Sequence, residues 1–233
     1  MKQLDVFLNE LQVIFKERLL SVTIFGSSAN AGLDKVKNNV DLMIVLDTFS
    51  GEDIKIAERI IKKWMRAKNP YPIIMGKDEF FNSQDVFAME YADIQWNYQV
   101  VFGSDLVQYL HVDYKDLRLQ CEREVKSLLM KLRGYFMQYG NSRSAMNHAF
   151  KNLISSCIVI FRTILRLKGI TPSVYKGDVI NQVTDILGID KLLFTKLLAH
   201  KEGTSRLHLH TLDVDIVEMI NQLSMILTKV DKM

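Results

Sequence analysis

The distribution of strand-like segments along the chain constrains its fold more than any other feature. Short apolar runs rich in β-branched residues alternate with helical patterns up to about residue 112, and none follows. These runs lie at 22–25, 40–46, 71–76 and 99–103. The sequence therefore predicts a unit of alternating strands and helices at residues 1–112, followed by an all-α helical bundle at residues 113–233.

Helices are predicted where apolar residues recur every three or four positions. In the first unit this spacing begins at Leu4 and returns from Gly51 to Lys68, and a further helix is expected from Asp85 to Tyr98. In the second unit it predicts helices at 115–139, 143–168, 174–187, 190–200 and 212–230. The run at 71–76 contains Pro72, so that strand is expected near a sheet edge, where a missing N–H is tolerated.

Composition excludes several classes of protein. Apolar residues make up 48% of the chain and charged residues 24%, which is typical of a globular protein and not of a disordered one. The formal net charge is only +3, so a nucleic-acid partner is not expected. Cys121 and Cys157 fall in apolar stretches and are predicted to be core thiols. The longest apolar run is too short to span a bilayer, so a soluble cytoplasmic protein with no membrane partner is expected.

A turn between the first two strand-like runs carries the candidate site. The first run ends at Gly26 and Ser27, and the second carries Asp41. Glycine lets a phosphate approach the backbone, serine adds a donor, and a carboxylate on the neighbouring strand can hold Mg²⁺. Gly26, Ser27 and Ser28 are therefore candidate nucleotide-binding residues and Asp41 a candidate metal ligand. The alternative is that Asp41 caps or salt-bridges its strand and Gly26 only makes a tight turn.

The same stretch resembles the small bacterial nucleotidyltransferases of the polymerase-beta superfold, which join a minimal nucleotidyltransferase domain to a helical bundle. Their pattern is a strand, Gly-Ser, a small residue, and then Asp-x-Asp in a second strand; Gly26, Ser27, Ala29 and Asp41 match it. The resemblance implies an α+β fold with a mixed sheet and flanking helices. It also implies Mg²⁺, a nucleoside triphosphate, and transfer of a nucleotidyl group to a hydroxyl of a small molecule or protein.

Two of the three carboxylates in that pattern are replaced here. Asn39 stands where the first aspartate belongs, and the third carboxylate falls near Ile73 or Ile74. Asparagine is uncharged and isoleucine cannot bind a metal. The catalytic candidates are therefore Asp41 and Asn39, and two hypotheses stay open. The protein is a nucleotidyltransferase with weakened or lost activity, or it is a non-catalytic nucleotide-binding or regulatory module.

Four further residues are auxiliary candidates. Glu90 and Asp93 share a face of one helix and could supply a replacement metal ligand or base, or could be surface or interdomain carboxylates. Arg162 and Arg166 lie four apart on an apolar helix, where they could meet a nucleotide phosphate or pair with Glu122 or Glu124. The acceptor is not identified by the sequence, and a homodimer is one arrangement open to the chain.

Overall fold

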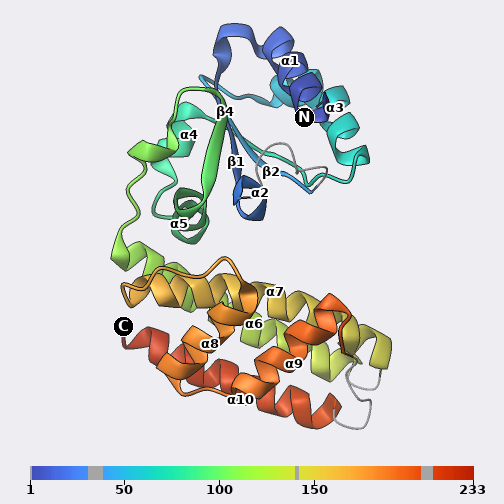
Figure 1. Ribbon diagram of the computed structural model, residues 1–233, viewed down its shortest axis with the longest axis vertical. Coiled ribbons are helices and arrows are strands. Elements are labelled where there is room, and N and C mark those ends of the chain that lie inside the picture. Colours follow the sequence, from blue (N-terminus) through green and yellow to red (C-terminus); the bar gives the residue numbers. More distant parts are fainter. Residues whose placement is uncertain (1, 31–38, 140–141, 206–211) are drawn as a thin grey trace. The chain divides into compact units, whose positions relative to one another are not determined.

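The computed structural model describes residues 2–30, 39–139, 142–205 and 212–233. The chain divides between Asp113 and Tyr114 into two compact units (Figure 1). The first contains a four-stranded sheet with helices, and the second is built from helices. The predicted α+β class, a mixed sheet with flanking helices followed by an all-helical region, is therefore confirmed.

The sheet of the first unit has the strand order β3-β2-β1-β4. Its strands are β1 (Leu19–Phe25), β2 (Asp41–Leu46), β3 (Ile73–Gly76) and β4 (Tyr98–Gly103). Strand β1 pairs antiparallel with both β2 and β4, whereas β2 and β3 are parallel. The sheet is therefore mixed, and β3 lies at an edge, as its neighbouring proline predicts.

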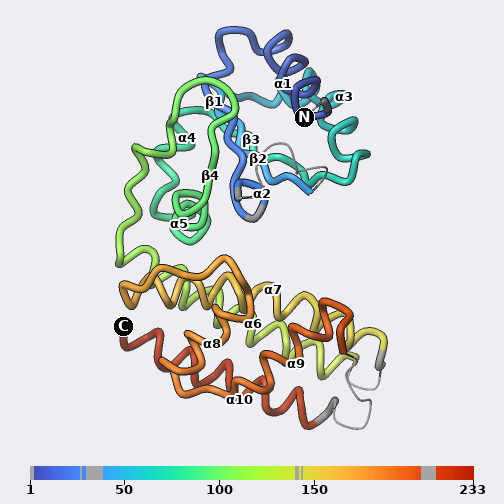
Figure 2. The backbone as a smooth tube through the Cα atoms, viewed as in Figure 1, coloured from blue at the N-terminus to red at the C-terminus, as the bar shows by residue number. Residues whose placement is uncertain are grey.

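Helices cover both faces of this sheet (Figure 2). The helices of this unit are α1 (Lys2–Phe15), α2 (Ser27–Asn30), α3 (Gly51–Arg66), α4 (Lys77–Asn82) and α5 (Ala88–Trp96), with short 3₁₀ turns η1 (Lys16–Arg18) and η2 (Val107–Tyr109). The helix expected to begin at Asp85 begins instead at Ala88. Helix α4 has no counterpart in the predicted pattern, because six residues are too few to show a helical period.

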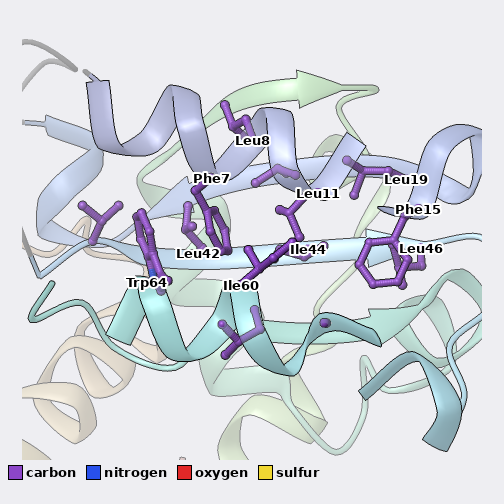
Figure 3. Packing of buried hydrophobic residues seen from close by; sticks show 14 of the residues in the cluster. Phe7, Leu8, Leu11, Phe15, Leu19, Leu42, Ile44, Leu46, Ile60 and Trp64 are labelled. Carbon is purple, nitrogen blue, oxygen red and sulfur yellow. The ribbon is translucent and has the colours of Figure 1, made fainter. Parts of the chain in front are cut away.

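The central strand β2 contributes to a core on each side of the sheet. Leu42, Ile44 and Leu46 pack with α1 and α3, where the rings of Phe7 and Trp64 stack with centroids 4.5 Å apart (Figure 3). The alternate residues of β2 pack on the opposite face, against residues of α4 and α5. Burial of both faces explains why β2 is a continuous apolar run and not an alternating one.

An ion pair joins the start of α3 to the turn before β1. The Arg18 guanidinium donates to both carboxylate oxygens of Asp53, at 3.2 and 2.6 Å. The backbone N–H and hydroxyl of Ser50 donate to the same carboxylate, at 2.9 and 3.0 Å. These hydrogen bonds, above all those from Arg18, lower the pKa of Asp53 to about 2. Asp53 is buried, so its charge depends on these donors.

We expect Asp53→Asn to lower the free energy of unfolding by about 2 kcal/mol at neutral pH, because charge-assisted hydrogen bonds are lost. The pKa is lower in the folded state than the ordinary 3.8, so the stabilisation is complete above about pH 4 and is lost towards pH 2. Urea unfolding at several pH values should therefore show a difference between wild type and variant that shrinks on acidification. Glu52→Gln, an exposed acid in the same helical turn, is the matched control; an equal effect there would contradict the prediction.

The second unit contains α6 (Tyr114–Tyr139), α7 (Arg143–Leu167), α8 (Lys176–Leu187), α9 (Lys191–Glu202) and α10 (Leu212–Asp231). Helix α6 packs against α7 and α10, and α7 packs against α8 and α9. Both cysteines are buried in this unit, and burial raises the pKa of each thiol to about 12, which confirms the prediction of core thiols. Among the described helices, none has the length and apolarity needed to cross a membrane.

Candidate functional site

The turn between β1 and α2 is held from β4. Gly26 has φ +69°, a left-handed conformation that glycine adopts at little cost. Its N–H donates to the Asn97 carbonyl at 3.0 Å, and the Asn97 side-chain amide donates back to the Gly26 carbonyl. Asn97 directly precedes β4, so the sheet fixes the position of the turn.

The Asp41 carboxylate lies beside this turn. Asp41 opens β2 and pairs in register with Phe25, the last residue of β1. A Cβ atom built on Gly26 would lie 3.6 Å from Asp41 Oδ2, so the glycine and the carboxylate face each other. Burial raises the pKa of Asp41. Among the backbone and side-chain groups that the structure describes, no donor or cation is bonded to this carboxylate, so no capping or salt-bridging role for Asp41 is observed among them.

Asn39 does not continue β2. It has φ +62° and is exposed, and its carbonyl accepts a hydrogen bond of 3.0 Å from the Ser28 hydroxyl. Asparagine tolerates this left-handed conformation better than most residues. Because Asn39 is not extended, the two-residue alternation of a strand does not place its side chain beside that of Asp41. Ser28 is buried and uses its hydroxyl to hold this bend.

Strand β3 brings an isoleucine to the face that carries Asp41. Ile73 pairs in parallel register with Met43, which lies two residues after Asp41 on β2. Side chains two apart on a strand, and side chains paired across strands, point to the same face. Ile73 and Phe25 accordingly pack on the same core cluster as Met43, whereas Ile74 packs on the opposite one. Position 73 is therefore where a second carboxylate would share the Asp41 face.

The other candidates occupy separate elements. Glu90 and Asp93 lie on α5, the first exposed and the second half-buried. Ser27 is the first residue of α2. No group of three or more His, Cys, Asp or Glu residues in the described part of the chain is arranged to hold a metal ion.

Arg162 and Arg166 lie half-buried on α7 in the second unit. The Arg162 guanidinium donates to the Val174 carbonyl at 3.2 Å. Their suggested ion-pair partners form ion pairs within α6: Glu122 with Arg118 at 3.1 Å and with Lys126 at 3.6 Å, and Glu124 with Arg123 at 3.9 Å.

Two asparagines that build the site were not singled out from the sequence. Asn97 holds the Gly26 turn, and buried Asn69 accepts from the Val40 N–H at 3.2 Å while donating to the Trp64 carbonyl at 3.3 Å. Asn97 lies directly before β4, and Asn69 lies directly before Pro70. Asparagine is common at such positions because its side-chain amide forms hydrogen bonds with nearby backbone groups. Here, however, Asn97 bonds Gly26 and Asn69 bonds Val40, and both of these residues lie far away in the sequence.

We expect Asn97→Ala to lower the free energy of unfolding by about 1 kcal/mol, because one hydrogen bond to the turn is lost. Asn97→Asp should cost more, since a carboxylate would then face the Gly26 carbonyl oxygen. Asn82→Ala, at the exposed end of α4, is the control. Urea unfolding of the three variants gives the free energy of unfolding of each. An Asn97→Asp variant as stable as wild type would contradict this account of the turn.

Comparison with known proteins finds similarity among solved structures. No family model matches the chain, and no curated protein matches it. Among solved structures, the chain is similar to spectinomycin adenyltransferase AAD(9) from Enterococcus faecialis, whose crystal structure was determined with ATP and spectinomycin. The TM-score is 0.58 at 13% sequence identity, over 96% of this chain and 98% of that one. At this identity the similarity concerns the fold, and the chain therefore has a nucleotidyltransferase-like fold.

Proposed function

We propose that this protein binds a nucleoside triphosphate together with Mg²⁺ at the Gly26 turn and Asp41. The observation that carries the proposal is the Asp41 carboxylate facing Gly26, with no partner among the described residues. It is supported by the nucleotidyltransferase-like fold and by the ATP of the similar adenyltransferase. Ionised carboxylates rarely remain half-buried without a partner, so a ligand for Asp41 explains its position.

The turn suits phosphate in two ways. Gly26 has no side chain, so a phosphate can approach the backbone closely. The first N–H groups of a helix have no partner within it, and α2 begins at the next residue. The Gly26 N–H is already bonded to Asn97, so Ser27 and Ser28 would supply the backbone donors.

The residues present fit one Mg²⁺ ion. Mg²⁺ prefers oxygen ligands and is commonly held by one or two carboxylates together with substrate phosphates and water. Asp41 supplies one such carboxylate, and a cation beside it would favour its ionised form against the effect of burial. When bound, Mg²⁺ would offset the negative charge of the triphosphate. A site for two ions needs further carboxylates, which Asn39 and Ile73 do not provide.

The proposal includes two candidate functions, which differ in whether the bound nucleotide reacts. Nucleotidyl transfer would form a bond between an acceptor hydroxyl oxygen and the α-phosphorus, break the bond to pyrophosphate, and require a base for the hydroxyl proton. Ile73 cannot accept a proton, and it occupies the sheet position nearest Asp41 on β3. This observation favours the second candidate function, a non-catalytic nucleotide-binding or regulatory module.

Thermal unfolding with a panel of nucleoside triphosphates, each with and without Mg²⁺, tests the proposal. A ligand at about a hundred times its dissociation constant stabilises the folded state by about 2.7 kcal/mol. This should raise the midpoint by roughly 5–10 °C in a chain of this size. We expect nucleotide to raise the midpoint more in the presence of Mg²⁺ than in its absence. No shift with any nucleotide would overturn the proposal, and pyrophosphate release in the same samples separates transfer from binding alone.

A further inference from the structure

We propose that one exposed stripe of α6 binds an acidic amphipathic helix of another protein. The residues of this α6 stripe are Leu119, Arg123, Lys126, Met130, Arg133 and Met137. They are spaced alternately by four and three residues, the period that keeps side chains in line along a helix that pairs with another. The inference is independent of the nucleotide site.

The α6 stripe lies on the side of the helix away from its own core. Leu119, Met130 and Met137 have exposed fractions of 55, 66 and 81%. The buried side chains of α6 include Cys121 and Leu132, which belong to the opposite face. Three large apolar side chains exposed in one line mark a surface that gains stability when another molecule covers it.

The charge around the α6 stripe is positive. From residue 125 to residue 139, where α6 ends, the sequence has three Lys or Arg residues and no Asp or Glu, although the whole chain carries only +3. Arg123 and Lys126 form long ion pairs with Glu124 and Glu122, at 3.9 and 3.6 Å. Helix α6 has no acid after Glu124, so the exposed Arg133 has no acidic neighbour along its own helix. An acidic partner therefore matches the stripe.

The order of the residues favours a helix over other partners. Helices that lie on membranes separate their apolar and cationic faces, whereas here both kinds of side chain share one line. Surfaces that bind single-stranded nucleic acid combine cations with aromatic rings, and the α6 stripe contains no aromatic residue. In a second copy of the chain, pairing through the same stripe would set Arg123 against Arg123 or Arg133, a like-charge contact.

The test uses a synthetic helical peptide of about 20 residues, with leucine and glutamate at the same alternating spacing so that leucines face Leu119, Met130 and Met137. A second peptide has lysine in place of each glutamate. Fluorescence anisotropy measures the binding of each labelled peptide to the full chain. We expect the glutamate peptide to bind and the lysine peptide not to bind. Arg133→Glu should weaken binding of the glutamate peptide at least tenfold.

The matched control is Lys151→Glu, which makes the same charge change at an exposed position of α7. Wild-type affinity in this control supports the proposal, and equal weakening overturns it because only net charge would matter. The same assays include a thymidine oligonucleotide and phosphatidylserine vesicles. The proposal is also overturned if the glutamate peptide does not bind, or if either of these probes binds through Arg133 more tightly than the peptide does. Because Arg133 is exposed, Arg133→Glu should not change the midpoint of unfolding.

Discussion

Replacing Asp41 with alanine is expected to weaken the binding of MgATP about 100-fold, which corresponds to about 2.7 kcal/mol. The reason is that Asp41 is the one carboxylate facing the Gly26 turn among the described residues, so its loss removes the protein's charged metal ligand. Isothermal titration calorimetry with MgATP measures the change. Asp78→Ala, an exposed acid in the first turn of α4, is the control and should bind like wild type.

For ATP without Mg²⁺, the expected effect of Asp41→Ala on affinity is reversed. Without Mg²⁺, a carboxylate beside the phosphates repels them, so Asp41→Ala should bind free ATP at least as tightly as wild type does. A variant that had merely lost its fold would bind neither form. Equal affinity of wild type and Asp41→Ala for MgATP would contradict a role for Asp41 in holding the ion.

A carboxylate at position 73, in a chain that also carries aspartate at position 39, is expected to strengthen the metal site. In Asn39→Asp/Ile73→Glu, the new glutamate lies on the β3 strand, on the face that carries Asp41. We expect the Mg²⁺ concentration for half-maximal nucleotide binding to fall about tenfold, because more than one carboxylate then shares the charge of the ion. Release of pyrophosphate from ATP would show that the restored site also reacts.

The control for this pair is Asn39→Asp/Ile73→Gln, which has the same shape at position 73 without the charge. Both double variants place a polar group where Ile73 now packs on the core, so their stabilities should be lowered similarly and any difference in Mg²⁺ dependence reports the carboxylate. If the glutamate and glutamine variants respond alike to Mg²⁺ while remaining folded, β3 does not contribute to this site.

The sequence predicted the fold class well because its signals are local. Helical spacing and β-branched runs mark α3 and β2, and the absence of such runs beyond residue 112 marks the helical region. Contacts between distant residues left no comparable signal. The Arg18–Asp53 ion pair and the Asn97 clamp on Gly26 join residues 35 and 71 positions apart. Nor does a strand pattern reveal the bend at Asn39, because asparagine is compatible with extended and left-handed backbone alike.

The most direct test of the nucleotide site replaces Mg²⁺ with paramagnetic Mn²⁺ and follows the backbone amide signals of the full chain by NMR. An ion held by Asp41 broadens the signals of nearby amides most strongly, so titration with MnATP should first remove those of Gly26, Ser28, Asp41 and Leu42. The same titration of Asp41→Ala should leave these signals visible. Broadening that begins in the helices of the second unit, or that is unchanged in Asp41→Ala, would place the ion elsewhere and contradict the proposed site.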